Sequence, residues 1–220
     1  MSAVDISQHY SRKAGEYGYD VRACEYKGVQ PFIQRQKILL RMLKDFSGKT
    51  LLDIGCGTGA LAAPLAGRNK LVGVDISPAM LGLARATHFP VSAHGKALPF
   101  PQSIFDAVLG IEVMQHLPDA AAFLAEMTRV AKPDGSIVLA MIHSRSWLQA
   151  LLRAFGLSPK IYCWHSPEEI AGLLAGGGWN LSELYFLAMP TGVVWRSARP
   201  QHPLDFLAAA WVACFRKAES

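Results

Sequence analysis

The chain of 220 residues is 51% hydrophobic and 18% charged, a composition typical of one folded domain with a full core. No apolar run approaches the roughly 20 residues of a membrane span, and residues 1–20 are too polar for a signal peptide, so we expect a cytoplasmic protein without a span. The net charge of +5 arises mostly before Lys49, which fits either an anionic partner such as nucleic acid or a solvated basic helix face. None of the four cysteines belongs to a CxxC pair, which argues against a zinc site or a disulfide scaffold.

Residues 1–49 are predicted to be helical, because apolar residues between Gln30 and Phe46 recur at helical spacing. Beyond them, apolar strands alternate with helices. Strands are predicted at 50–55, 70–76, 89–95, 105–113, 135–143, 181–190 and 208–217, and helices at 59–67, 77–86, 119–132 and 166–179. Segments 144–165 and 190–203 are expected to be irregular insertions.

This alternation is typical of βαβ units, which form a parallel sheet covered on both faces. The last two strands leave no room for a full helix between them, so we expect an antiparallel ending. The predicted fold is therefore a single α/β domain, 1–220. It contains a Rossmann-like, seven-stranded, mostly parallel sheet with an antiparallel last strand and helices on both faces.

The stretch from Leu51 to Ala66, LLDIGCGTGALAAPLA, places three glycines between a strand and a predicted helix. In an open parallel sheet, ligands bind beyond the carboxyl ends of the strands, and glycines let the backbone approach them closely. Asp75 ends the next strand, about 20 residues further on, where a carboxylate accepts the hydroxyl hydrogens of a ribose. We therefore expect a nucleoside site.

Two nucleoside ligands compete for this site. The run GCGTGA, Gly55 to Ala60, matches the degenerate G-x-G-x-x-A fingerprint of dinucleotide-binding proteins. Asp53 stands just before these glycines, where it would repel a pyrophosphate but attract the sulfonium and ammonium groups of S-adenosylmethionine. This charge favours the methyl donor over a nicotinamide dinucleotide.

The segments LLDIGCGTG, VGVDISPAML, ALPFPQSIFDAV and RVAKPDGSIVLAMIH follow one another at the spacing of a known family. Over residues 45–142 the sequence resembles the class I S-adenosylmethionine-dependent methyltransferases of small-molecule type, including those of ubiquinone and menaquinone biosynthesis. The resemblance implies S-adenosylmethionine as cofactor, with a helical lid at 1–49, a cofactor-binding core at 50–143, and a substrate cap with the last strands at 144–220.

The resemblance also implies a set of cofactor-binding residues. Around the methionine part and in its pocket it places Asp53, Gly55, Cys56, Gly57, Gly59 and Ile111; at the ribose and the adenine it places Asp75, Ile76, Met80, His94, Gly95, Lys96, Ala97 and Leu98; in the lid it places Tyr17. The family often has an aspartate at the place of His94, and a histidine accepts a hydrogen bond only through a neutral ring nitrogen.

Two histidines are candidates for the base that some methyl acceptors require. His116 lies in IEVMQHLPD, which resembles the EVLEHVPD-like segment of quinone-biosynthesis enzymes, and His143 ends the fifth predicted strand. In some relatives two glutamates and the histidine of that segment bind a divalent metal; here Gln115 replaces the second glutamate, and we predict no metal site. Tyr10 and Tyr17 resemble tyrosines of the family's lids. For all four side chains, ordinary packing is the alternative.

The two insertions are expected to cap the acceptor with apolar side chains, Trp147, Leu148, Leu151, Phe155, Tyr162, Trp164 and Trp195. Such a wall suits an aromatic, quinone-like, polyketide or lipid-like acceptor methylated on oxygen or carbon, although packing within a helical cap is the alternative. The absence of an N/D-P-P-Y segment argues against a DNA substrate. A non-catalytic S-adenosylmethionine-binding regulatory or assembly protein and a nicotinamide oxidoreductase remain as alternatives. We make no prediction of oligomeric state.

Overall fold

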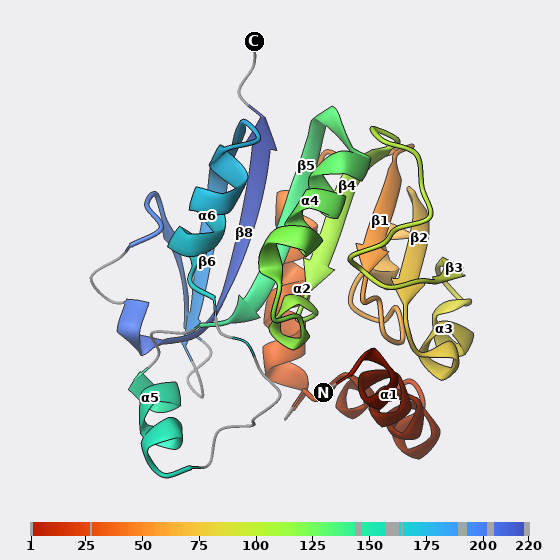
Figure 1. Ribbon diagram of the computed structural model, residues 1–220, viewed down its shortest axis with the longest axis horizontal. Coiled ribbons are helices and arrows are strands. Elements are labelled where there is room, and N and C mark those ends of the chain that lie inside the picture. Colours follow the sequence, from red (N-terminus) through yellow and green to blue (C-terminus); the bar gives the residue numbers. More distant parts are fainter. Residues whose placement is uncertain are drawn as a thin grey trace.

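The computed structural model describes residues 2–26, 28–143, 147–156, 163, 165–188, 193–201 and 205–217. These residues form one sheet of eight strands in the order β3-β2-β1-β4-β5-β8-β6-β7. The strands are β1 Thr50–Ile54, β2 Lys70–Asp75, β3 Phe89–Ser92, β4 Phe105–Ile111, β5 Ala131–Ile142, β6 Trp179–Ala188, β7 Val194–Ser197 and β8 Ala208–Lys217. β1 to β5 are parallel, and β8 lies antiparallel between β5 and β6 (Figure 1). The predicted Rossmann-like fold is confirmed.

Helices cover both faces of this sheet. The helices of the described residues are α1 Ala3–Tyr17, α2 Val29–Met42, α3 Pro78–Ala84, α4 Ala120–Val130, α5 Trp147–Ala154 and α6 Pro167–Ala175; α4 and α6 cover one face and α2 the other. On one face, Phe123 of α4 and Ile170 of α6 are buried in a cluster with Val108 of β4. On the other, Leu39 of α2 shares a second cluster with Leu109. Successive side chains of a strand point to opposite faces, so β4 contributes to both cores.

The segment 59–67 was predicted to be a helix, and this prediction is wrong. Its regular structure is limited to a short 3₁₀ helix, Ala63–Leu65. Pro64 has no amide hydrogen to donate to the carbonyl of Ala60, as an α-helix would require. The Gln36 side chain of α2 instead donates to the carbonyl oxygens of Ala60 and its successor, both at 3.1 Å. These contacts hold the chain after the glycines in an irregular turn.

The sheet contains one strand more than the seven predicted. The additional strand, β7, lies in the predicted insertion 190–203 and pairs antiparallel with β6, bringing Trp195 beside Phe186. Because β7 is an edge strand of only four residues, its alternation is too short to be recognised in the sequence.

The other insertion, 144–165, contains α5, and three of the expected cap residues on or next to it, Trp147, Leu151 and Phe155, are exposed. Trp195 packs against the core on the first face of the sheet. The remaining expected cap residues, Tyr162, Trp164 and the side chain of Leu148, lie outside the described residues.

The N-terminal segment has two different positions in the fold. α2 packs into the core, whereas α1 lies beside α3 at the carboxyl ends of β1 and β2 (Figure 1). The Ser7 hydroxyl donates to the Ile76 carbonyl at 2.8 Å, and the Ser11 and Ser77 hydroxyls are 2.9 Å apart. These contacts fix α1 over that end of the sheet. In the part of the chain described here, none of the helices has the length and apolar character needed to cross a bilayer.

Candidate functional site

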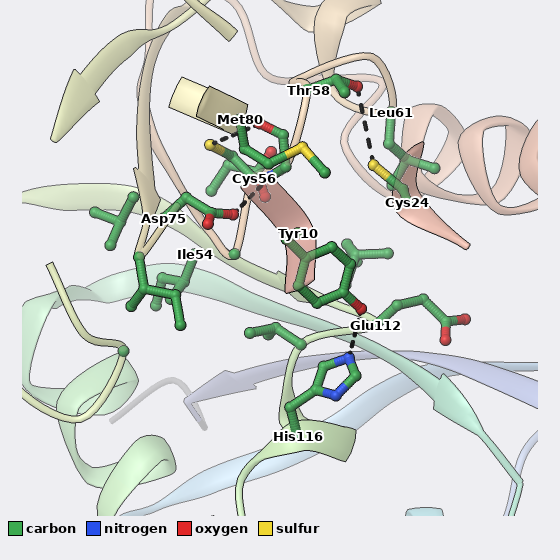
Figure 2. A pocket seen from close by; sticks show the side chains of 18 of the residues that line it. Tyr10, Cys24, Ile54, Cys56, Thr58, Leu61, Asp75, Met80, Glu112 and His116 are labelled. Atoms are coloured by element: carbon green, nitrogen blue, oxygen red, sulfur yellow. Dashed lines mark hydrogen bonds between the residues drawn. The ribbon is translucent and has the colours of Figure 1, made fainter. Parts of the chain in front are cut away.

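A cavity lies between α1 and the carboxyl ends of β1, β2 and β4 (Figure 2). It contains about 1090 Å³ of empty space, a figure that includes the open solvent at its mouth. Most of its described lining is apolar, with Ile6, Val21, Phe32, Leu61 and Leu117 among the contributors. The polar groups that could orient a ligand are therefore few, and they come mainly from the glycine loop, the strand ends and the N-terminal segment.

The glycine loop after β1 forms one wall of the cavity. Gly55 and Gly57 have φ values of +68° and +53°, in the left-handed region that glycine favours. A Cβ atom on Gly55 would lie 2.5 Å from Cγ2 of Val113, so no larger residue fits there. The amides of Gly55 and Cys56 both donate to the carbonyl of Val74, at 2.7 and 3.1 Å. The loop is thus tied to β2 and exposes bare backbone to the cavity.

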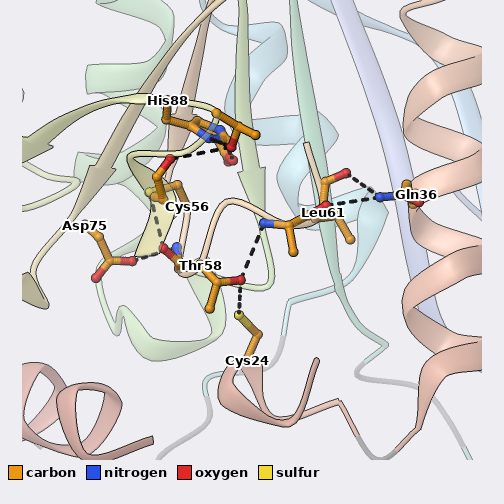
Figure 3. A network of polar contacts seen from close by, with 12 residues as sticks. Cys24, Gln36, Cys56, Thr58, Leu61, Asp75 and His88 are labelled. Atoms are coloured by element: carbon orange, nitrogen blue, oxygen red, sulfur yellow. Dashed lines mark hydrogen bonds and ion pairs between the residues drawn. The ribbon is translucent and has the colours of Figure 1, made fainter. Parts of the chain in front are cut away.

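The N-terminal segment contacts this loop through Cys24, which ends the short 3₁₀ helix Val21–Cys24. Its sulfur is 3.9 Å from the Thr58 hydroxyl (Figure 3), and a Cβ atom on Gly57 would lie 2.8 Å from it. Burial raises the pKa of the Cys24 thiol, which therefore stays protonated. Cys24 packs the N-terminal segment against the glycine loop, and no sequence motif predicted this contact.

Asp75 lies at the end of β2, on the cavity wall. Its two carboxylate oxygens accept the amides of Gly57 at 2.9 Å and Ser77 at 2.8 Å. Burial raises the pKa of this carboxyl group, while the bonds from Ser77 and Gly57 act in the opposite direction. Asp53, at the end of β1, also lines the cavity and is only 5% exposed. One buried carboxylate, Asp53, and one half-buried carboxylate, Asp75, therefore flank the glycine loop.

His94 lies in the loop after β3 and also lines the cavity. Its Nδ1 accepts the amide of Lys96 at 3.1 Å, and burial followed by the charge of Lys96 lowers the pKa of the ring. A neutral ring that accepts at Nδ1 carries its hydrogen on Nε2. His94 consequently offers a hydrogen-bond donor, whereas the sequence comparison suggested an acceptor at this position.

His116 forms a polar chain with residues of the N-terminal segment. Its Nε2 is 2.8 Å from the Tyr10 hydroxyl of α1 (Figure 2), and that hydroxyl donates to Oε2 of Glu25 at 3.2 Å. The second oxygen of Glu25 is 2.9 Å from Nε2 of His9. Burial lowers the pKa of His116 to about 4, although the Glu25 charge acts in the opposite direction. His116 is therefore a neutral imidazole on the cavity wall at neutral pH.

Glu112, which follows β4 and also lines the cavity, is held by an ion pair. Nε of Arg35 lies 2.5 Å from Oε1 of Glu112, and both side chains are largely buried, at 8% and 15% exposure. Arg35 also donates to the carbonyl of Pro31 at 3.1 Å, and its guanidinium lies over the Tyr26 ring. Glu112 adopts φ +57°, a left-handed conformation that costs about 1 kcal/mol or more for a residue with a side chain.

Comparison with known proteins agrees with this geometry. Residues 52–139 match the family model described as a methyltransferase domain. The ubiquinone biosynthesis O-methyltransferase of Paramagnetospirillum magneticum is 32% identical over 173 residues, which cover 70% of this chain and 69% of that protein. The chain belongs to the class I S-adenosylmethionine-dependent methyltransferases. This family excludes the nicotinamide oxidoreductase that the glycine run alone allowed.

Solved methyltransferase structures share the fold over almost the whole chain. A Thermotoga maritima methyltransferase described as a possible histamine N-methyltransferase superposes with a TM-score of 0.74 at 20% identity, covering 97% of this chain and 100% of that one. The magnesium protoporphyrin IX methyltransferase of Synechocystis with bound S-adenosylhomocysteine gives 0.72 at 18% identity, covering 99% and 100%. The cofactor of the present methyltransferase is S-adenosylmethionine, and its substrate is a small molecule.

The structure brings most of the predicted site residues of this methyltransferase to the cavity wall: Asp53, Gly55, Cys56, Gly57, Asp75, Ile76, Met80, His94, Gly95, Ile111 and His116. Several others are not among the described lining residues: Gly59, Lys96, Ala97, Leu98, Tyr17 and His143. Tyr17 and Ala14 of α1 pack with Met80 of α3 in a small cluster, whereas Tyr10 of α1 lines the cavity. His143 is fully buried in the core, with its ring 5.5 Å from that of Phe186.

Sequence reasoning overlooked three side chains that shape the site, Glu25, Arg35 and His88. Each acts on the cavity through a partner that is distant in sequence, and none lies in a recognisable motif. Of the two positions that the sequence resemblance linked to a metal, Glu112 is paired with Arg35, and Gln115 is a buried amide. Among the described residues, no group of three or more His, Cys, Asp and Glu side chains is arranged to hold a metal ion.

Proposed function

We propose that this methyltransferase methylates an oxygen or carbon atom of a flat, largely apolar small molecule, foremost an aromatic or quinone-like compound. Polyketides and lipid-like molecules belong to the same chemical range. The observation that carries the proposal is the Glu25–Tyr10–His116 chain, whose Tyr10 and His116 line a largely apolar cavity. The relative from P. magneticum, named as an enzyme of ubiquinone biosynthesis, supports an acceptor of this kind.

The polar residues of the cavity fit the cofactor. We assign the ribose hydroxyls to Asp75, whose oxygens retain lone pairs beyond the two amides they accept. The Asp53 carboxylate suits the ammonium and sulfonium charges, and the bare Gly55–Gly57 backbone admits the methionine part. His94 would donate to a ring nitrogen of the adenine, since its Nδ1 is occupied by Lys96.

The bound cofactor supplies a methyl group activated by a positively charged sulfur. The residues of the chain orient the acceptor toward it and exclude water, which accounts for much of the rate in reactions of this kind. Neutral His116 accepts the proton that a phenol or carbon acid releases as its electron pair forms the bond to the methyl carbon. The Tyr10 hydroxyl and the Glu25 carboxylate stabilise the resulting imidazolium.

The test is an acceptor screen in which formation of S-adenosylhomocysteine is followed over panels of phenols, catechols, hydroxyquinones, amines and carboxylic acids. We expect turnover in the first three panels. With the best acceptor, His116→Asn should lower kcat by about 10²-fold or more, the usual contribution of a general base, and should change the Kd of S-adenosylhomocysteine less than twofold. Tyr10→Phe should lower kcat less, because it leaves the imidazole in place.

A matched control is His165→Asn. His165 is also largely buried and pairs with a glutamate, Glu169 at 2.7 Å, but it does not line the cavity. Its substitution should leave kcat unchanged. Turnover confined to amines or acids, or a kcat that is the same in His116→Asn and the wild type, would overturn the proposal. Tight binding of S-adenosylhomocysteine without turnover in any panel would instead support the non-catalytic alternative.

A further inference from the structure

His88 lies behind the glycine loop, on the side away from Cys24 (Figure 3), and its side chain is fully buried. Two glycines make room for it. A Cβ atom on Gly59 would lie 2.7 Å from Nδ1 of His88, and one on Gly73 of β2 would lie 3.1 Å from its Cβ. The ring is thus wedged between the loop and β2. It does not line the cavity, so it cannot contact a ligand there directly.

The polar contacts of His88 give the ring a defined direction. Its Nδ1 is 2.8 Å from the Thr87 hydroxyl, and its Nε2 is 3.3 Å from Oδ2 of Asp53, a contact at ion-pair distance that lacks the geometry of a hydrogen bond. A buried carboxylate repels a nitrogen lone pair, so the tautomer with its hydrogen on Nε2 is favoured beside Asp53, and Nδ1 then accepts the Thr87 hydroxyl hydrogen. One oxygen of Asp53 is therefore contacted electrostatically from behind the loop, while the residue itself forms part of the cavity wall.

We propose that His88 is a positioning residue of the cofactor site, holding the Asp53 carboxylate in the orientation that receives the amino-acid part of the cofactor. The inference rests on the proposed role of Asp53. A buried carboxylate is stable only when its oxygens are hydrogen-bonded or paired with charge. The Nε2 edge of the His88 ring places a positive partial charge 3.3 Å from one oxygen of Asp53, and the ligand's ammonium group supplies a full charge on the other side. The ring also props the loop through Gly59, so that carboxylate and loop are positioned by the same side chain.

The experiment compares two ligands that differ in the amino-acid part. S-adenosylhomocysteine carries the ammonium and carboxylate groups, and 5′-methylthioadenosine lacks both. In His88→Leu, which fills the space without a polar edge toward Asp53, we expect the Kd of S-adenosylhomocysteine to rise about tenfold, because the carboxylate loses its electrostatic contact behind the loop. The Kd of 5′-methylthioadenosine should change less than twofold. His88→Gln, whose amide can still donate, should restore most of the lost affinity.

Two outcomes would overturn the inference. Equal weakening of both ligands in His88→Leu would mean that the ring only supports the fold, and unchanged affinity for both would mean that Asp53 does not need it. Asp53→Asn separates this inference from the proposed function. If Asp53→Asn weakens S-adenosylhomocysteine selectively and His88→Leu does not, the assignment of Asp53 stands and that of His88 falls. If Asp53→Asn has no effect, the proposed role of Asp53 is wrong, and the inference about His88 falls with it.

Discussion

The buried Arg35–Glu112 ion pair, on the cavity wall at Glu112, leads to a prediction about the free energy of unfolding. We consider Arg35→Met, which keeps an apolar stem of similar length and removes the guanidinium. In the native chain that guanidinium contacts the Glu112 carboxylate at 2.5 Å and the Pro31 carbonyl at 3.1 Å. The substitution therefore leaves the Glu112 carboxylate, only 15% exposed, without the counter-charge of Arg35. Glu112 is also already in a left-handed conformation.

Removing one partner of a buried ion pair costs about 3–5 kcal/mol, because the remaining charge stays desolvated. The lost bond to Pro31 contributes about 1 kcal/mol of this, and the small exposure of Glu112 favours the lower end of the range. We expect the free energy of unfolding to fall by about 3 kcal/mol. Neutralising the carboxylate as well should recover part of the loss, so the double variant Arg35→Met/Glu112→Gln should be about 1–2 kcal/mol more stable than Arg35→Met.

Urea denaturation at pH 7.5, followed by circular dichroism, measures all four members of this double-mutant cycle. With a typical urea m-value of about 2–3 kcal/mol/M, the midpoint should move down by about 1 M in Arg35→Met. Lys37→Met, an exchange at an exposed residue of the same helix that forms no ion pair with the described part of the chain, is the matched control and should leave the midpoint nearly unchanged. A loss below about 1 kcal/mol in Arg35→Met, or a coupling energy near zero, would show that the pair is not desolvated as the structure has it.

Three further predictions concern the cofactor site and its base. Asp75→Ala should raise the Kd of S-adenosylmethionine at least tenfold, about 1.4 kcal/mol for lost charge-assisted hydrogen bonds; an unchanged Kd by titration calorimetry would remove the ribose assignment. Gly55→Ala should abolish cofactor binding and lower stability by about 2 kcal/mol or more, measured by thermal denaturation, because the new methyl group meets Val113 at a left-handed φ. The folded pKa of His116, about 4, lies below its ordinary value of 6.5, so the unfolded chain takes up this proton first as pH falls. The free energy of unfolding should therefore fall by up to about 3 kcal/mol between pH 7 and pH 4, and His116→Asn should flatten this pH dependence. If urea titrations gave the same pH dependence for His116→Asn and the wild type, the burial of the His116 ring would be contradicted.

The parts of the cofactor site that could be predicted from the sequence are carried by contiguous residues. Strand β1, the glycines and Asp53 lie within one short stretch, and Asp75 follows at the end of the next strand. Parallel strands bring their carboxyl ends to one edge, so this order along the chain already places the two carboxylates beside the loop. The same reasoning failed at 59–67, where helical composition was overridden by a proline and by a side chain from α2.

Only one of the two histidines predicted as bases lies at the cavity. His116 and His143 both end or follow a strand at the cavity side, and from the sequence they are equivalent candidates. The structure places His116 on the cavity wall and packs His143 in the core against Phe186. Which of two strand-end side chains faces the cavity depends on the twist of the sheet and on the segments packed over it, and neither is encoded locally.

The sequence by itself determined the class of fold, the cofactor and the positions of the glycine loop and its two carboxylates, because hydrophobic periodicity and glycine spacing are local properties. Only the tertiary structure decided which side chains act on them. Tyr10 meets His116 across 106 positions and Arg35 meets Glu112 across 77, while His88 reaches Asp53 from behind the loop. Such pairs form when helices and strands that are distant in the chain are packed together, and no pattern within either segment specifies the partner.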